Sequence, residues 1–511
     1  MQINVVKNAK RNMLFGTVNR SIILVIPFIE RTAIQMILGS QYLGLGSLFD
    51  SLIKMLSLTE LGFSSAMVYN MYKPAAEGNI QRMNALLNYY KKVYRVIGTV
   101  ILAIGLSLIP FLPRLIKGSH PANITLSKLY IIYLLNTSIS YFLYGYLTCL
   151  LVVHQREDVR STVDSCVRVG LAVTQICLLW STKNYYYFAV MLPTFTIINN
   201  LWTTERVKRL FPQYKAEGMI SADDRKRIKK LVAGTFIQQA CKVTRNSLDS
   251  ICVSAFLGLT LTAIYNNYYL ILHGVTTFVG IFTASIVGGV GNHVAIRSVK
   301  ENFEEMEKLD FVYLWIAGWC TICLLCLYQP FMKLWMGKDM MLPMSAVFFF
   351  CSYFYLLKLG DVRTMYSSAN GLWWEHRYRA LGETILNLIL NIYLGKRYGI
   401  HGIILATMIS LFLCNYIWSV SIIFKLYFAR TRQRRYYIYQ GKMTAVMVFA
   451  GIITYLFCCT VPLNNALQQF VARAGLCIVI PNVFYYVAFK NSEQFQYAKK
   501  LLLRRRNNEY S

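Results

Sequence analysis

The chain has 511 residues, of which 56% are hydrophobic and 15% are charged, and its mean hydropathy is +0.42. A soluble protein of this length needs roughly 25% charged residues to cover its surface, so most soluble enzymes are excluded. The net charge of +30 does not indicate a nucleic-acid binder either. Lys and Arg stand in short clusters beside apolar stretches, and no basic domain is present to contact nucleic acid.

Apolar segments long enough to cross a bilayer follow one another along nearly the whole chain. A helix needs about 20 apolar residues to cross the hydrocarbon core, and fourteen segments reach this length. They cover approximately residues 12–37, 45–72, 93–116, 127–152, 160–181, 185–203, 230–256, 261–291, 309–330, 344–369, 379–396, 402–427, 442–461 and 468–489. The sequence therefore predicts an all-α polytopic membrane protein with about 14 transmembrane helices.

Lys and Arg are concentrated in every second connection between these segments. If the N-terminus is cytoplasmic, the cytoplasmic connections and termini hold 36 Lys and Arg residues, whereas the outer connections hold 8. Basic residues near membrane spans stay on the cytoplasmic side, so both termini are predicted to be cytoplasmic. The outer connections are too short to hold the acceptor of a membrane glycosyltransferase or polymerase, and we expect no enzyme activity.

The longest polar connection divides the spans into a group of six and a group of eight. The predicted organisation is an N-lobe at 1–204, a basic cytoplasmic linker at 205–229, a C-lobe at 230–430, and a C-terminal helix pair with a basic cytoplasmic tail at 431–511. Arg31 is followed twelve residues later by Leu43-Gly44, and Arg245 is followed twelve residues later by Leu257-Gly258. This shared spacing indicates duplicated halves, as in many transporters. The even number of six spans in the first group predicts that the two repeats are parallel.

The first span of each half carries basic residues inside the apolar segment. A charged residue at mid-membrane costs at least about 2.5 kcal/mol, so it usually faces a cavity or a partner. Eleven residues separate Arg20 from Arg31, which brings both to nearly the same helical face as Pro27. Together with Lys242 and Arg245 in the seventh span, they predict a polar lumen for an anionic substrate such as a phosphate or pyrophosphate, with which arginine forms bidentate hydrogen bonds.

Local ion pairs are the alternative for several intramembrane charges. Asp50 and Lys54 in the second span are four residues apart, so they can neutralise each other. Arg245 with Asp249, and Asp164 with Arg168, have the same spacing. These pairings would leave Lys242 as the uncompensated charge of the seventh span.

Three of the 13 cysteines, Cys320, Cys323 and Cys326, have the C-x2-C-x2-C spacing of an iron–sulfur ligand set. They stand among Leu and Ile with no suitable fourth Cys nearby, so we interpret them as packing residues on a buried helix. The six His residues have no metal-ligand spacing, and no G-x-x-x-x-G-K-[S/T] loop is present. We therefore expect no metal, no cofactor and no ATP hydrolysis by that loop.

Two segments resemble a known transporter family. TELGFSSAMVYNMYKPAAEGN at 59–79 is similar to the signature of bacterial polysaccharide repeat-unit flippases, which serve O-antigen and capsule synthesis. That family belongs to the multidrug/oligosaccharidyl-lipid/polysaccharide (MOP) exporter superfamily. LGETILNLILNIYLGKRYGIHGIILATMIS at 381–410 resembles the hairpin of its eleventh and twelfth spans, with Gly399 and Gly402 at the tight outer turn. The resemblance extends to the plan of two six-span lobes plus an added pair of spans.

The resemblance implies a V-shaped, alternating-access transporter with a MOP/MATE-like fold in the bacterial cytoplasmic (inner) membrane. Its implied substrate is an undecaprenyl-pyrophosphate-linked oligosaccharide, and its implied partners are membrane lipids, a polysaccharide polymerase and chain-length machinery. The residues at the family's lumen-lining positions are Arg20, Arg31, Lys54, Lys242 and Arg245.

Three acidic residues inside the predicted spans leave an alternative transport function open. Glu30, Asp249 and Glu383 are candidates for coupling transport to protons or sodium, or for ion pairs. A cation-coupled multidrug exporter of the same fold is the alternative function, although organic cations favour an acid-rich lumen rather than one with arginines.

Overall fold

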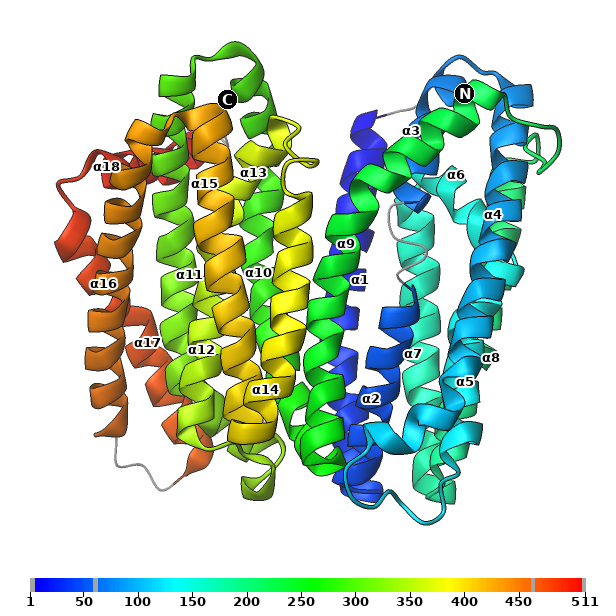
Figure 1. The fold of residues 1–511 in the computed structure, drawn as a ribbon, viewed down its shortest axis with the longest axis horizontal. Helices are drawn as coiled ribbons and strands as arrows, with labels where there is room; N and C mark the ends of the chain where they lie inside the picture. Colours follow the sequence, from blue (N-terminus) through cyan, green and yellow to red (C-terminus); the bar gives the residue numbers. More distant parts are fainter. Residues whose placement is uncertain (1–4, 58–62, 461–464, 508–511) are drawn as a thin grey trace. The chain divides into compact units, whose positions relative to one another are not determined.

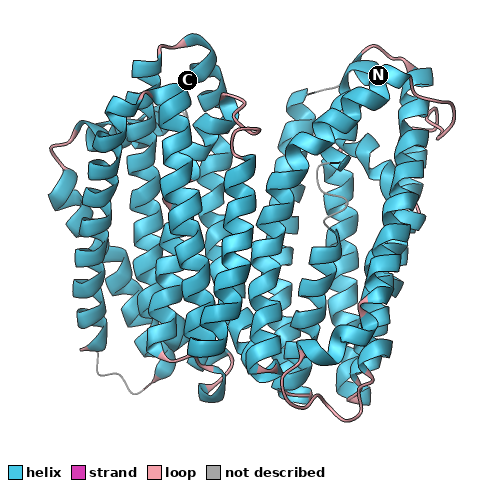
Figure 2. Ribbon diagram, viewed as in Figure 1, coloured by secondary structure: helices cyan, strands magenta, loops and turns pink. Residues whose placement is uncertain are grey.

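The computed structural model describes residues 5–57, 63–460 and 465–507, and within these ranges every regular element is a helix (Figure 2). This confirms the predicted all-α fold. Packing divides the chain into two compact units, Met1–Ala263 and Ile264–Ser511. The lobe boundaries at residues 204, 229 and 430 stay predictions, because they concern which helices move together.

The first unit is built from long helices joined by short connections (Figure 1). They are α1 (Val5–Ile37), α2 (Ser40–Leu56), α3 (Phe63–Ala76), α4 (Ile80–Ser107), α5 (Leu126–Phe142), α6 (Thr148–Val153), α7 (Glu157–Thr182), α8 (Tyr185–Leu210) and α9 (Ala222–Leu257). α1 packs along α7, α7 and α5 pack along α8, and α2 packs along α9. Asn79, Asn184 and Ser221 begin α4, α8 and α9 by accepting a backbone N–H of the first turn.

The second unit holds the remaining helices, apart from the first residues of α10. They are α10 (Leu259–Ile296), α11 (Val299–Trp335), α12 (Met344–Lys358), α13 (Asp361–Ala369), α14 (Arg377–Ser410), α15 (Ser419–Ile423), α16 (Gln433–Cys459), α17 (Ala466–Phe489) and α18 (Glu493–Asn507). Ser298 and Glu301 form a reciprocal capping box at the start of α11. α11, α16 and α17 pack against one another, and α12 packs against α11 and α14.

The described residues include eight helical stretches long and apolar enough to cross a membrane, or up to ten if each of two bent pairs is one span. Several expected spans fall outside this number for physical reasons. α2 has only 17 residues, α9 carries many charges, and 377–428 runs as one stretch of 52 residues although it turns back within α14. The chain is thus a multi-pass membrane protein, and the count of fourteen stays a prediction.

The turn inside α14 lies where the sequence predicts it. Gly399 has φ 59° and ψ −133°, a conformation that L side chains rarely adopt. A Cβ atom at Gly402 would overlap the backbone carbonyl of Leu394. Both glycines are therefore required for the chain to reverse here, which confirms the predicted tight turn.

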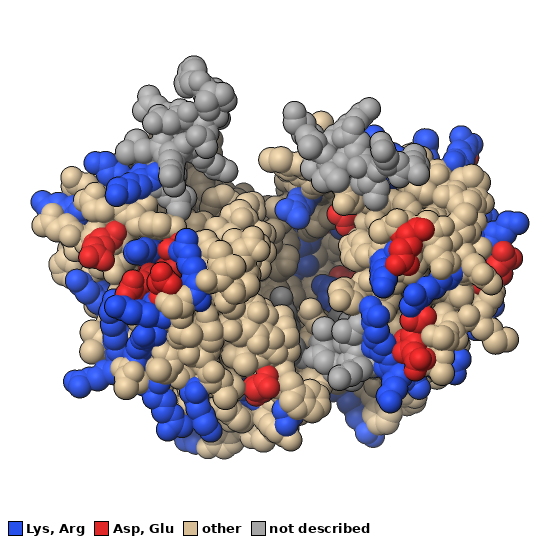
Figure 3. Space-filling view, turned by 90° about the horizontal axis from the view of Figure 1, so that it is seen from above, with Lys and Arg blue, Asp and Glu red and all other residues tan. Residues whose placement is uncertain are grey.

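Figure 3 views the molecule from the end at which α1 begins, and Lys and Arg side chains stand there among Asp and Glu on both units. Within the units, three ion pairs near this end are Arg11 with Asp158 at 2.8 Å, Arg82 with Asp224 at 2.7 Å, and Arg435 with Glu307 at 2.5 Å. This is the end that the charge distribution predicts to be cytoplasmic.

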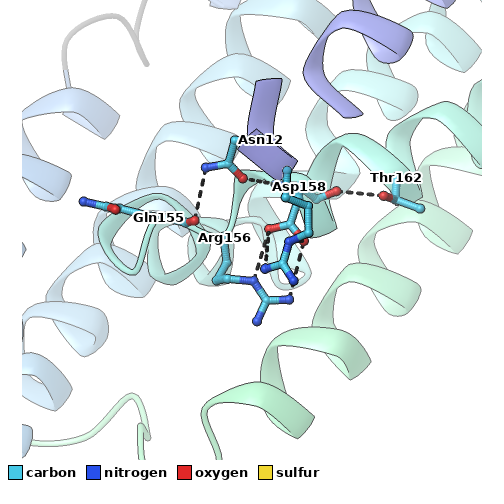
Figure 4. Close-up of polar contacts among 6 residues, drawn as sticks. Asn12, Gln155, Arg156, Asp158 and Thr162 are labelled. Carbon is cyan, nitrogen blue, oxygen red and sulfur yellow. Dashed lines mark hydrogen bonds and ion pairs between the residues drawn. The ribbon is translucent and has the colours of Figure 1, made fainter. Parts of the chain in front are cut away.

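Asp158 joins the start of α1 to the start of α7 (Figure 4). Its carboxylate lies 2.8 Å from Nε of Arg11 and 3.1 Å from Nε of Arg156. Its backbone N–H donates to Oδ1 of Asn12 at 2.8 Å, and the Asn12 amide donates to the carbonyl of Gln155 at 3.1 Å. The two helices that pack along their whole length are therefore fixed in register at this end.

We expect Asp158→Ala to lower the free energy of unfolding by about 3 kcal/mol, because it leaves two arginines beside a buried site without their carboxylate. Thermal unfolding of the purified protein in detergent measures the loss. Asp223→Ala removes an exposed carboxylate from the first turn of α9 and is the matched control. An equal, small shift in both variants would contradict the role of Asp158.

His154 fastens the connection between α8 and α9 to the end of α6. Its Nε2 lies 3.2 Å from the hydroxyl of Tyr214, its Nδ1 lies 3.0 Å from the carbonyl of Leu150, and its ring packs on Phe211. Burial lowers the pKa of His154 below its usual 6.5. The folded state thus favours the neutral ring.

This pKa shift predicts that acid loosens the 211–221 connection. When the 211–221 connection is detached, His154 has its usual pKa of about 6.5 and binds a proton more readily than when the connection is packed on it. The packed connection is therefore stabilised above about pH 6.5, and this stabilisation is lost as the pH falls below that value. Hydrogen exchange of 211–221 should accelerate between pH 7.5 and pH 5, after correction for intrinsic exchange. His154→Phe should remove the pH dependence. The same acceleration in that variant would show that another group is responsible.

Candidate functional site

Arg31 on α1 is the centre of a polar cluster inside the first unit. Its guanidinium donates to the hydroxyl of Ser47 on α2 at 3.1 Å and to the backbone carbonyl of Ala263 on α10 at 3.2 Å. Ser47 in turn donates to the carbonyl of Leu43 one turn earlier. The predicted lumen arginine is therefore held in place by groups from two other helices.

Asp50 on α2 lies one turn beyond Ser47 and has an exposed side chain. It interacts electrostatically with Lys54, Arg31 and Arg168. Asp50 and Lys54 form no ion pair within 4.0 Å in the described part of the chain. The local neutralisation that the spacing allows is therefore incomplete, and the carboxylate is shared among three cations.

Glu30 pairs with Arg168 on α7, whose Nη2 lies 3.3 Å from its Oε2. The second carboxylate oxygen, Oε1, is buried and has no hydrogen-bond partner among the described residues. The predicted local pair of Asp164 with Arg168 is wrong. Asp164 instead lies 3.6 Å from Arg160 and accepts a hydrogen bond from Asn199. Packing of α1 along α7 offers Arg168 a more deeply placed carboxylate than its own helix does.

A pair of tyrosines closes the cluster on the side of α5 and α8. The hydroxyls of Tyr133 and Tyr185 are 2.9 Å apart, and both are close enough to Arg31 to interact electrostatically. Gly46 allows this approach, because a Cβ atom there would lie 2.5 Å from the Tyr185 hydroxyl. Residue spacing gave no indication of either tyrosine, because they come from helices distant in the chain.

Two of the predicted lumen cations, Arg20 and Lys54, are exposed. Arg20 lies on the face of α1 that also holds Arg31, as the eleven-residue spacing predicts. Within the described part of the chain, Arg31 alone of these three forms hydrogen bonds to other helices. Because α1 and α2 run in opposite directions from a short turn, Arg20 and Lys54 both lie on the side of the cluster toward the beginning of α1.

On α9, Arg245 and Asp249 are both buried, with exposed fractions of 8% and 4%. They are one turn apart, so the expected pair with each other stays a prediction. The side chain of Lys242, the third predicted residue of this helix, lies outside the described residues. α9 packs on α2, the helix that carries Asp50.

The end of this unit opposite the beginning of α1 is closed by a seam between α2 and the α9–α10 turn. We call this the α2–turn seam; it consists of Ser40, Gly44, Leu115, Lys117, Ser254, Leu259 and Thr260. The hydroxyls of Ser40 and Thr260 are 3.3 Å apart, and the Ser254 hydroxyl donates to the Leu115 carbonyl at 2.8 Å. A Cβ atom at Gly44 would overlap the backbone of Leu259. The seam depends on glycine at the Leu-Gly pair that the repeat pattern identifies.

In the second unit, Glu383 is buried and lies 2.8 Å from Arg379 on the same helix, α14. Glu383 therefore forms an ion pair with Arg379. Its other expected role, ion coupling, stays a prediction. A second buried acid of this unit, Asp310 on α11, accepts a hydrogen bond from Gln440 at 2.5 Å. The sequence does not single out Asp310, because this residue lies at the start of a predicted span, where a charge carries no penalty.

Comparison with solved structures finds this fold in membrane transporters. The chain is similar to the lipid II flippase MurJ in an inward closed conformation, with a TM-score of 0.69 and 15% identity over 94% of this chain and 99% of that chain. An inward-facing MATE family multidrug resistance transporter of the MOP superfamily has a TM-score of 0.60 and 14% identity over 80% of this chain and 98% of that chain. The Vibrio cholerae MATE transporter VcmN has a TM-score of 0.56 and 10% identity over 83% and 98%.

No family model and no curated protein sequence matches the chain. Identities of 10–15% show a shared fold, which here is the MOP/MATE-like fold of a multi-pass membrane protein. The known proteins of this fold named above are flippases and transporters.

Proposed function

We propose that this protein is a flippase that translocates undecaprenyl-pyrophosphate-linked oligosaccharide repeat units across the bacterial cytoplasmic membrane by alternating access. The observation that carries the proposal is the cluster at Arg31, in a chain whose fold matches a lipid II flippase over 94% of its length. A transporter of this kind has no catalytic residues, and we assign none.

The cluster suits the binding of a phosphorylated headgroup. The Arg31 guanidinium is a planar fork of N–H donors, and this fork matches the oxygens of a phosphate group in bidentate hydrogen bonds. A pyrophosphate oxygen that displaces the exposed Asp50 carboxylate would find the same cations, Arg31, Lys54 and Arg168, already assembled. In this proposal Asp50 holds the place of the substrate anion between cycles, and Lys242 and Arg245 of α9 complete the cationic lining.

The physical problem of moving a sugar across lipid also fits this arrangement. Moving sugar hydroxyls through hydrocarbon without hydrogen bonds costs free energy, whereas the apolar polyprenyl tail is stable in the hydrocarbon core. The headgroup would therefore pass through a hydrated path lined by α1, α2 and α9 while the tail stays in lipid. We propose that the α2–turn seam opens at the outer side to release the headgroup and then closes again.

The remaining topology belongs to the same proposal. It places both termini in the cytoplasm, fourteen spans in the inner membrane, and an N-lobe and a C-lobe at 1–204 and 230–430 that rock as units. Membrane lipids are direct partners, and a polysaccharide polymerase and chain-length machinery act on the product at the outer face. Glu30 and Asp249 are proposed to couple the movement to protons or sodium.

A reconstitution experiment tests the function. The purified protein is inserted into liposomes with a fluorescent undecaprenyl-pyrophosphate oligosaccharide, and a membrane-impermeant quencher or glycosidase reports the fraction in the outer leaflet. We expect protein-dependent equilibration of the lipid-linked sugar between leaflets. Failure with a set of lipid-linked oligosaccharides of differing charge, in vesicles where the protein is folded and monodisperse, would refute the proposal.

The alternative function, a cation-coupled multidrug exporter, rests on the two acidic residues of the cluster, Glu30 and Asp50. Export of cationic dyes from cells, abolished by Glu30→Gln, would favour it. Under the flippase proposal, expression of the protein leaves dye accumulation unchanged.

A further inference from the structure

Cysteines from three helices of the second unit converge at one buried point. Cys326 lies on α11, Cys458 near the end of α16, and Cys477 on α17, with exposed fractions of 2%, 1% and 1%. Their sulfur atoms all lie within 4.8 Å of one another. Cys326 on α11 lies more than a hundred residues before Cys458 and Cys477 in the sequence. No local spacing therefore predicts the cluster.

A fourth thiol lies beside this group. Cys477 is within hydrogen-bonding reach of Cys323, Cys326 and Cys458. Cys323 belongs to the C-x2-C-x2-C run of α11, which has no suitable fourth cysteine nearby in the sequence. The fold supplies two more, from α16 and α17.

The cluster is held by a rigid frame. The indole N–H of Trp319 on α11 donates to the backbone carbonyl of Cys477 at 2.8 Å, and that of Trp315 donates to Oδ1 of Asn482 at 2.9 Å. Both bonds fix α17 against α11 close to the level of the thiols. Because the backbones are fixed, small rotations of the cysteine side chains set the distances between sulfur atoms.

These distances suit a metal held by thiolates. A zinc–sulfur bond of about 2.3 Å places sulfur ligands about 4 Å apart. The sulfur atoms here are separated by up to 4.8 Å, so small side-chain rotations that move each sulfur by less than about 1 Å would bring them to this spacing. Soft sulfur ligands select Zn²⁺ and Cu⁺ over hard cations such as Mg²⁺.

A cation stands beside the thiols. Arg473, one turn before Cys477 on α17, interacts electrostatically with Cys458 and Cys477. Its Nε is buried and has no hydrogen-bond partner among the described residues. Three thiolates and a divalent ion leave one negative charge, which Arg473 balances, whereas a monovalent ion would leave two.

We propose that Cys326, Cys458 and Cys477 form a binding site for a soft divalent metal ion of the zinc class, with Cys323 as the source of a fourth sulfur ligand. On binding, the thiols of Cys326, Cys458 and Cys477 give up their protons to solvent and each sulfur donates an electron pair to the ion, while Cys323 offers its sulfur as a neutral thiol. No oxidant or reductant is required. The ion would cross-link the C-terminal helix pair, α16 and α17, to α11.

The geometry favours a metal over the two other fates of clustered cysteines. A disulfide uses two sulfurs and leaves the third buried beside it, whereas a metal uses all three. Packing as small apolar groups explains burial but not the placement of a buried arginine nitrogen beside the sulfurs. The site is independent of the proposed transport function, because it lies in other helices than the Arg31 cluster.

Metal content tests the proposal directly. The full-length protein is purified in detergent under reducing conditions, incubated with Zn²⁺, desalted and measured by inductively coupled plasma mass spectrometry. We expect about one Zn²⁺ per chain, lost in Cys458→Ser and in Cys477→Ser and weakened several-fold in Cys323→Ser. Cys351→Ser removes a buried cysteine of α12 outside the cluster and should retain the metal.

A second measurement keeps the test decisive if the serine variants fold poorly. In the wild-type protein, Zn²⁺ should protect Cys458 and Cys477 from alkylation, and should raise the midpoint of thermal unfolding, with Mg²⁺ as the inactive control. Peptide mass spectrometry of unreduced protein reads the other outcomes. A disulfide among these cysteines, or free thiols that bind no Zn²⁺, would overturn the proposal, and stoichiometric Cu⁺ without Zn²⁺ would overturn its assignment to a divalent ion.

Discussion

Arg31→Ala is expected to abolish transport of the lipid-linked oligosaccharide while leaving the protein folded. The substitution removes the group that bridges α1 to Ser47 and to the Ala263 carbonyl, and it leaves Asp50 with fewer compensating cations. Hydrogen bonds to a charged group contribute about 2 kcal/mol each, so flipping should fall at least about 30-fold. The liposome assay measures the rate, and surface polysaccharide in cells reports the consequence.

Matched variants separate substrate recognition from loss of structure. Arg31→Lys keeps the charge but not the planar fork, and it should restore only part of the rate. Arg114→Ala removes an exposed arginine of the same unit and should leave transport unchanged. Arg245→Ala on α9 is expected to act as Arg31→Ala does. Normal surface polysaccharide in both the Arg31 and the Arg245 variants, at normal protein abundance, would exclude a cationic lumen.

The helices are largely predictable from the sequence because membrane spans are long and apolar. The predicted spans 442–461 and 468–489 correspond to α16 (Gln433–Cys459) and α17 (Ala466–Phe489). The predicted span 45–72 is less faithful, since α2 ends at Leu56 and α3 begins at Phe63, with residues 58–62 outside the described part. Hydropathy integrates over about 20 residues, so it does not resolve a break inside an apolar stretch.

The site is predictable only where one helix determines it. The shared face of Arg20 and Arg31 follows from helical spacing alone. The partner of Arg168 does not, because the choice between Asp164 and Glu30 depends on how α1 packs along α7. Contacts between helices distant in the chain, such as the Tyr133–Tyr185 pair, leave no local pattern in a single sequence.

The cysteines show the same limit. The spacing of Cys320, Cys323 and Cys326 places all three on one helix, α11, in which Cys320 and Cys326 are buried. Whether other thiols approach that helix depends on the packing of α16 and α17, which spacing along the chain does not encode. Long-range convergence therefore defines both the Arg31 cluster and the cysteine cluster.

Gly44→Ala should slow transport by disfavouring closure of the α2–turn seam. The new Cβ atom would overlap the backbone carbonyl of Leu259. A backbone group cannot move away by a side-chain rotation, so α2 and the turn must separate. Overpacking of this kind costs about 1–3 kcal/mol, which shifts the equilibrium away from the closed seam by about 5- to 150-fold. We therefore expect slow transport in a protein that remains folded, because the open form of a transporter is itself a stable state.

A cross-link measures the seam directly. Cysteines placed at Ser40 and Thr260, whose hydroxyls are 3.3 Å apart, should form a disulfide readily in the parent protein and slowly in the Gly44→Ala background, as read by peptide mass spectrometry. Gly16→Ala adds a methyl group to α1 with no atom within 4 Å and should change neither cross-linking nor transport. Rapid cross-linking together with normal transport in Gly44→Ala would mean that α2 relaxes without opening the seam. Unfolding of Gly44→Ala without any open, folded population would instead show that the seam is static, because only a seam that opens during the cycle offers the chain a stable state in which the clash is absent.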